Sequence, residues 1–162
     1  MIRTPEETRV WDALEEVKDP EIPVLSIVEM KIVSLVRASG ASARVEITPT
    51  FAGCPALGQM KDEIRKLLGE MGFTDVSVET NFTAPWSTDL LDQNVREKLR
   101  SFGIAPPVPV QIDLGRALAE PVACPYCASS VTHLESAFGP TLCKQIFYCD
   151  ACLQSFERFK PL

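Results

Sequence analysis

Apolar residues recur at helical spacing in three segments of the chain. Thr4 and Glu7 form a capping box ahead of the first segment, and Gly72 is placed to end the second in a left-handed conformation. The pattern predicts helices over residues 5–17, over residues 55–71 and from a Thr88-Asp89 cap to Gly103.

Branched apolar residues between these helices indicate strands. Residues 27–37 are rich in them, and beyond a turn at Gly40 residues 43–47 alternate between apolar and polar side chains, which predicts a hairpin. Val76 and Val78 predict a short third strand. The order of elements is then helix, hairpin, helix, strand, helix, and we expect an α+β fold built on a small mixed α/β domain.

Prolines mark a boundary late in the chain. The segment from Ala105 to Pro109 holds three prolines and is expected to be stiff and extended. We therefore expect a linker over residues 104–118, which joins a domain of residues 1–103 to a cysteine-rich end of residues 119–162. That end is too short to build a hydrophobic core of its own, so it needs a metal.

Composition and charge exclude several classes of partner. The chain has 162 residues, 46% of them hydrophobic, and a formal net charge of −6. An acidic balance opposes attraction to phosphate backbones, so nucleic acid is not an expected partner. No apolar run is long enough to span a membrane, and the chain starts in a capped acidic helix instead of a basic and apolar leader. We expect a soluble, cytoplasmic protein without a membrane partner.

Four of the six cysteines form two Cys-x-x-Cys pairs near the end of the chain. The pairs are separated by 21 residues, and without a secretory signal they favour metal binding over disulfides. Four thiolates at this spacing are typical of structural zinc in a ribbon, although an iron-sulfur cluster or redox-active dithiols stay open as alternatives. The predicted zinc ligands are Cys124, Cys127, Cys149 and Cys152.

Two other residues of the cysteine-rich end, a cysteine and a histidine, lie outside the two Cys-x-x-Cys pairs. Cys143 is a surplus thiol, either buried beside Phe147 and Phe156 or exposed next to Lys144 and reactive. His133 is the only histidine of the chain, and we expect it in a loop because four cysteines already complete a tetrahedral site.

Cys54 stands alone in the first three quarters of the chain, in a Gly53-Cys54-Pro55 junction after a strand. Proline suits the first helical position, so the unpaired amides of the helix should favour the Cys54 thiolate. Thr48 and Thr50 are expected to line the same pocket. An inert, buried cysteine is the alternative. Without a nearby histidine or second cysteine, hydrolysis and dithiol chemistry are disfavoured, and a homodimer or a client protein would have to complete a metal site.

Three more residues have both a functional and a structural interpretation. Asp19 and Glu21 supply oxygen ligands for the Cys54 site, or they belong to a turn that ends the first helix. Trp86 covers the mouth of a pocket, or it fills the core.

Several of these motifs, taken in order, resemble a known family. Asp19 to Val24 before a strand, then Thr48 to Thr50 and Gly53 to Pro55, resemble the MIP-type family of iron-sulfur assembly domains over about residues 5–103. Ala84 to Asp89, the linker and a zinc ribbon with Phe138 to Lys144 resemble the branch of that family that accompanies the multicomponent phenylacetyl-CoA epoxidase.

The resemblance implies an accessory maturation factor of phenylacetate catabolism. Such a protein assists the assembly of iron-sulfur or di-iron centres in the oxygenase or reductase subunits of the epoxidase, with iron or a cluster held transiently at Cys54. Catalysis is then expected in the partner subunits, and this chain indeed lacks the paired Glu-x-x-His motifs of a di-iron oxygenase. A non-catalytic structural subunit, or a thiol oxidoreductase that uses Cys54 or Cys143, are the alternative functions.

Overall fold

The computed structural model describes residues 3–51, 53–83, 85–108 and 118–162. They form two compact units, Met1–Trp86 and Ser87–Leu162. Both helices and sheets are present, as the predicted α+β class requires. No helix in the described ranges is long and apolar enough to cross a membrane.

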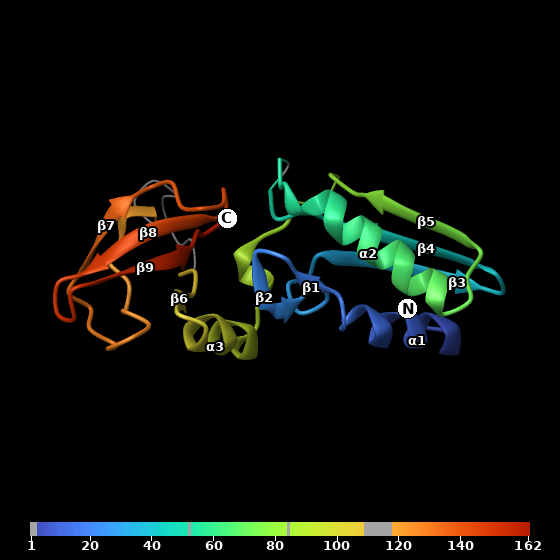
Figure 1. The fold of residues 1–162 in the computed structure, drawn as a ribbon, viewed down its shortest axis with the longest axis horizontal. Helices are drawn as coiled ribbons and strands as arrows, with labels where there is room; N and C mark the ends of the chain where they lie inside the picture. The colour runs from blue at the N-terminus through green and yellow to red at the C-terminus, as the bar shows by residue number, and fades with distance from the viewer. Residues whose placement is uncertain (1–2, 52, 84, 109–117) are drawn as a thin grey trace. The chain divides into compact units, whose positions relative to one another are not determined.

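The first unit contains two helices, two strands in a short hairpin and a three-stranded sheet (Figure 1). β1 pairs with β2 in antiparallel fashion, and the larger sheet has the order β3-β4-β5 with β3 antiparallel and β5 parallel to β4. The elements are α1 (Pro5–Leu14), β1 (Lys18–Asp19), β2 (Ile22–Ser26), β3 (Val33–Ser39), β4 (Ser42–Ile47), α2 (Ala56–Glu70) and β5 (Asp75–Thr80).

The ends of two of these elements differ from those that the sequence predicts. The Thr4 and Glu7 capping box is present, with both of its hydrogen bonds, but α1 ends at Leu14 and not at residue 17 because the chain then enters β1. The first strand of the predicted hairpin starts at Val33, since the preceding residues form a turn in which the Met30 amide donates to the Ser26 carbonyl. The hairpin itself and the third strand are confirmed.

The three-stranded sheet has an apolar face and a polar face. Ala43, Val45 and Ile47 of β4 are buried, as are Met60 and Ile64 on the apolar stripe of α2. Figure 1 shows α2 lying across this sheet. The alternation along β4 thus aims one set of side chains at the helix and buries it in a common core.

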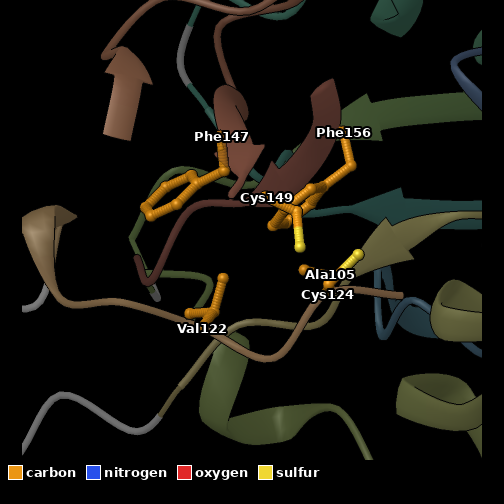
Figure 2. Packing of buried hydrophobic residues seen from close by; sticks show 6 residues of the cluster. All are labelled: Ala105, Val122, Cys124, Phe147, Cys149 and Phe156. Atoms are coloured by element: carbon orange, nitrogen blue, oxygen red, sulfur yellow. The ribbon is translucent and has the colours of Figure 1, made fainter. Parts of the chain in front are cut away.

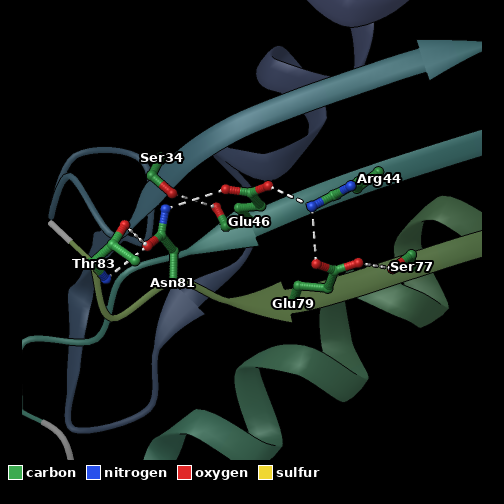
Figure 3. Close-up of polar contacts among 7 residues, drawn as sticks. All are labelled: Ser34, Arg44, Glu46, Ser77, Glu79, Asn81 and Thr83. Carbon is green, nitrogen blue, oxygen red and sulfur yellow. Dashed lines mark hydrogen bonds and ion pairs between the residues drawn. The ribbon is translucent and has the colours of Figure 1, made fainter.

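The polar face carries a chain of side-chain contacts instead (Figure 3). Arg44 bridges Glu46 at 2.8 Å and Glu79 of β5 at 2.9 Å, and Asn81 donates to the other oxygen of Glu46. Pairs this exposed add little stability, so the network keeps the face soluble more than it holds the sheet together.

The second unit joins a short helical segment to a four-stranded sheet of the order β6-β9-β8-β7. Asp92, and not Thr88-Asp89, caps the long helix: its side chain accepts from the Val95 amide at 3.0 Å, while Thr88 starts a separate 3-10 turn. The elements are η1 (Thr88–Leu90), α3 (Gln93–Ser101), β6 (Ile104–Ala105), β7 (Thr132–Ser136), β8 (Lys144–Cys149) and β9 (Gln154–Phe159).

The division into units differs from the boundary expected at residue 103. Helix α3 belongs to the second unit, and Ile104 and Ala105, at the start of the expected linker, form β6 by pairing in parallel with Glu157 and Arg158 of β9. Residues 109–117 of that linker lie outside the described part of the chain.

A small apolar cluster holds the second unit together (Figure 2). It comprises Ala105, Val122, Cys124, Phe147, Cys149 and Phe156. Two of the predicted metal ligands, Cys124 and Cys149, are themselves members of the cluster (Figure 2), and their sulfurs lie within 4.8 Å of one another. A metal bound there is therefore part of the core of this unit.

Candidate functional site

The crossover from β4 to β5 brings Cys54 to the carboxyl ends of two parallel strands. Ile47 and Thr80, the last residues of β4 and β5, pair with each other, and the chain runs from β4 through Cys54 into α2. In α/β folds, ligands bind at this edge of the sheet, beside the amino ends of the crossover helices.

The Cys54 side chain is half-buried at the start of α2. The backbone amides of Ala56 and Leu57, in the first turn of the helix, hydrogen-bond to its sulfur. Its own amide donates to the Phe51 carbonyl at 3.0 Å, which fixes the turn that leads into the helix. The sulfur thus lies against the helix amides and still reaches the surface.

The expectation of a favoured thiolate at Cys54 is wrong for the protein without metal. Burial raises the pKa of the Cys54 thiol above its usual value, and the carboxylates of Asp19 and Glu21 raise it further. The amides of Ala56 and Leu57 lower the pKa, but their effect is smaller than the effect of desolvation. At neutral pH, the Cys54 side chain is therefore mainly the neutral thiol.

Asp19 forms the tight turn between β1 and β2 and also lies near Cys54. It is only 6% exposed, and its Oδ1 accepts from the amides of Glu21 at 2.8 Å and Ile22 at 3.0 Å. This is an Asx turn, as the structural interpretation of the motif expected. The effect of both carboxylates on Cys54 shows that the turn also places negative charge beside the thiol.

Cys54 and these carboxylates do not close a metal site by themselves. Across the described ranges, only the four ribbon cysteines form a set of three or more such side chains whose ligand atoms lie within 4.8 Å of one another. A metal at Cys54 would need further ligands beyond the side chains that the structure describes there.

The other predicted pocket residues take different positions. Thr48 is buried, and its Oγ1 has no hydrogen-bond partner within the described segments, whereas Thr50 is half-buried and Gly53 is exposed. Trp86 is 7% exposed, and its Nε1 donates to the Met30 carbonyl at 2.7 Å. This contact favours the core interpretation of Trp86.

The four ribbon cysteines form a second, closed site, here called the clamp. The sulfurs of Cys124 and Cys152 are 3.7 Å apart, and those of Cys127 and Cys149 are 3.6 Å apart. Backbone amides of Cys152 and Ala151 donate to Cys149 and lower the pKa of Cys149 to about 7. Four sulfurs this close, in a site closed by protein ligands alone, match a tetrahedral structural metal site.

Each half of the clamp is followed by a residue in the left-handed region. Ala128, directly after Cys127, has φ 61°, and Leu153, directly after Cys152, has φ 59°. This conformation costs a non-glycine residue roughly 1–2 kcal/mol. It turns the chain so that an amide beyond the cysteine faces the sulfur, as the Ser129 amide does toward Cys127.

Cys143 and His133 lie outside the clamp. The Cys143 side chain is half-buried, and its sulfur is 3.2 Å from the Thr141 hydroxyl. His133 is on β7, not in a loop, and its Nδ1 is 3.0 Å from Asp150 Oδ2.

Comparisons with known proteins identify the family. The chain is 38% identical over 159 residues to an Escherichia coli protein whose assigned name is the D subunit of 1,2-phenylacetyl-CoA epoxidase, and the match covers 98% of this chain and 95% of the relative. The chain belongs to this family of epoxidase subunits.

Matches to smaller domains agree with the two sites of the chain. Residues 7–80, with Cys54, match the family described as iron-sulfur cluster assembly protein, and residues 111–160, with the clamp, match the PaaD zinc beta ribbon domain. The crystal structure of a domain of unknown function, DUF59, from Bacillus anthracis is 28% identical with a TM-score of 0.53, covering 57% of this chain and 90% of that one.

Sequence reasoning missed two features of these sites. It did not recognise that Asp19 and Glu21 oppose the Cys54 thiolate, although both had been placed near that site. It also overlooked Leu153, an exposed apolar residue in a left-handed position. The signal was present, because Ala128 and Leu153 occupy equivalent places after the two Cys-x-x-Cys pairs.

Proposed function

We propose that this chain is an accessory maturation factor for the phenylacetyl-CoA epoxidase, which helps to assemble iron-sulfur or di-iron centres in its iron-containing oxygenase or reductase subunits. Iron or a cluster is the cargo, and Cys54 is the ligand that holds it transiently. The family to which the chain belongs and the match of residues 7–80 to iron-sulfur cluster assembly proteins support this role.

One observation carries the proposal. A single half-buried thiol lies at the start of a helix beside two carboxylates, in a site that the described side chains do not close. A site with too few ligands binds metal weakly and leaves positions for a recipient, whereas a complete tetrahedral site retains its ion. Transfer of a metal or cluster from one protein to another requires a site with too few ligands of its own.

The electrostatics of the Cys54 site fit a cargo that is cationic. Asp19 and Glu21 disfavour the thiolate when no cation is present, but they attract a cation, and binding it displaces the thiol proton. The Ala56 and Leu57 amides then stabilise the sulfur after the proton has left. The buried Thr48 hydroxyl at the end of β4 is a further candidate contact.

We propose zinc as the resident metal of the clamp, with a structural role. Four cysteines that close the site are the donor set of structural zinc, and Cys124 and Cys149 also belong to the apolar cluster of the second unit. The clamp then holds this unit folded and takes no part in the transfer of iron. Catalysis lies in the partner subunits.

The test is Cys54→Ser in cells that produce the complete epoxidase system, with Cys143→Ser as the matched control. After anaerobic purification, we expect about one zinc per chain in both variants, but iron-depleted partner subunits with Cys54→Ser alone. Fully metallated partners in cells with only Cys54→Ser would refute the proposal. Stoichiometric recovery of this chain with the active complex would then support a structural subunit.

A homodimer that shares a cluster between two copies of Cys54 is one way to supply the missing ligands. It predicts a dimer whose visible absorption is lost with Cys54→Ser. A monomer without such absorption instead indicates that the client protein supplies the missing ligands. A mixed disulfide trapped between Cys54 and a client would favour the oxidoreductase function, which the raised pKa of the thiol disfavours.

A further inference from the structure

Three exposed apolar side chains surround the clamp in the second unit, and we call them the knuckle patch. Tyr126, Val131 and Leu153 are 57%, 60% and 69% exposed. Tyr126 lies within the first Cys-x-x-Cys pair, and Leu153 directly follows the second. The Val131 carbonyl accepts from the Asp150 amide at 3.0 Å, which places Val131 beside the second pair.

Leu153 combines a left-handed backbone with an exposed apolar side chain. Its backbone is left-handed, with φ 59°, a conformation that a branched side chain rarely adopts. Its side chain is also the most exposed of the patch, so it contributes little packing within the unit. The clamp turn accounts for the backbone here as it does at Ala128, but three exposed apolar side chains around one site point to a contact made outside the chain.

The charges around the patch restrict what can bind there. Asp150 is exposed beside Val131 and lies 3.0 Å from His133 Nδ1, and four thiolates around a divalent ion would carry a further net charge of about −2. Lys144 and Arg158, cations of β8 and β9, are buried, and Lys160 contacts the carbonyl of Leu142 in the loop before β8. Arg100 of α3 is paired with Glu97.

An anionic rim of this kind disfavours several occupants. A nucleic acid or an anionic membrane surface would be repelled, and so would the same patch of a second copy, in a chain of net charge −6. A cationic protein surface is attracted.

We propose that the knuckle patch is the docking surface for a protein partner that presents an apolar side chain flanked by lysine or arginine. In the context of the proposed function, on which this inference rests, the partner is one of the subunits served by Cys54. Leu153, the most exposed of the three side chains, is the anchor of this contact.

Binding of separately purified oxygenase and reductase subunits of the epoxidase to the full, metal-loaded chain tests the proposal. We expect Leu153→Gly to keep its metal and to melt no lower than the wild type, because glycine accepts the left-handed backbone, and to weaken binding of one subunit about tenfold or more. Ala128→Gly makes the same backbone change in the other half of the clamp and should bind as the wild type does. Raising NaCl from about 50 to about 300 mM should weaken wild-type binding.

Leu153→Asn gives a second variant, since asparagine tolerates this backbone and is polar. Unchanged affinity in both Leu153 variants, or no binding by any subunit, overturns the proposal. So does a wild-type dimer that Leu153→Gly dissociates, because the patch would then join two copies. If Leu153→Gly loses binding while Cys54→Ser leaves the partner's iron intact, the docking proposal stands and the maturation role fails. If Leu153→Gly binds as the wild type does while Cys54→Ser depletes the partner's iron, only the docking proposal fails.

Discussion

The clamp and the Cys54 site both present cysteine sulfur, but they differ in the number of ligands and in how far the sulfurs belong to a core. In the clamp, four sulfurs lie within 4.8 Å of one another, and two of them belong to the core of their unit. Cys54 instead presents one sulfur at a helix start, beside carboxylates and without a complete ligand set. The number of ligands and their connection to the core distinguish a site that retains metal from one suited to release it.

The protons on the sulfurs do not follow this division, because desolvation raises the pKa of Cys152 in the clamp to about 12. Backbone amides lower the pKa of Cys149, whereas burial and two carboxylates raise the pKa of Cys54. Both sites have helix or turn amides near sulfur, so amides alone do not decide the state of a thiol. Desolvation and neighbouring charge decide it at Cys54.

The largest effect is expected when the clamp loses a ligand. Cys149→Ser should abolish stoichiometric zinc and unfold the second unit, because structural zinc contributes on the order of 10 kcal/mol to the folding of small metal-dependent domains. Elemental analysis gives the metal content, and thermal unfolding followed by circular dichroism gives the stability of each unit.

Two single-sulfur variants are the controls for that comparison. Cys54→Ser and Cys143→Ser should keep the zinc and the unfolding midpoint of the wild type, since neither sulfur belongs to the clamp. Two results would contradict the division into a clamp that retains metal and a Cys54 site that binds it transiently. One is a Cys149→Ser variant that still holds one zinc per chain, and the other is a Cys54→Ser variant that has lost its zinc.

An intermediate effect is expected when one charge near Cys54 is removed. Asp19→Asn keeps the oxygen that accepts from Glu21 and Ile22, so the turn should persist, but it removes an anion that raises the pKa of Cys54. The pKa should fall, and iodoacetamide should alkylate Cys54 about three- to tenfold faster at pH 7–8, where the thiolate is the minor form. Mass spectrometry of the Cys54 peptide measures the rate.

Glu70→Gln is the control for this experiment, because Glu70 lies at the opposite end of α2 from Cys54. The pH profile sharpens the test: the wild-type rate should rise up to a midpoint above the usual thiol pKa, and Asp19→Asn should move that midpoint to lower pH. If the midpoint of the pH profile is the same in Asp19→Asn as in the wild type, the Asp19 carboxylate does not affect the pKa of the Cys54 thiol.

Features set by local chemistry were predictable from the sequence. The Thr4 and Glu7 box and the positive φ of Gly72 at the end of α2 follow from residues only a few positions apart. The convergence of the four clamp cysteines follows from the spacing of two short motifs. The family resemblance was confirmed by the 38% identical relative.

Features set by distant contacts were not predictable in this way. The end of α1 depends on the pairing of Lys18 in β1 with Ser26 in β2. Membership of α3 in the second unit depends on β6 pairing with a strand more than fifty positions later. The pKa of Cys54 depends on desolvation, which no motif encodes. In each case tertiary packing overrides a correct local signal.

The smallest effect is expected from relaxing the clamp backbone. Ala128→Gly removes the penalty of a left-handed alanine, roughly 1 kcal/mol, and part of the gain is offset by the greater freedom of glycine in the unfolded chain. A net gain of about 0.5 kcal/mol should raise the melting temperature of the metal-loaded second unit by about 2–4 °C. Ala123→Gly, at an exposed position before Cys124 where φ is not positive, should lower it instead. If both variants lower it, the left-handed backbone at Ala128 carries no penalty large enough for glycine to relieve.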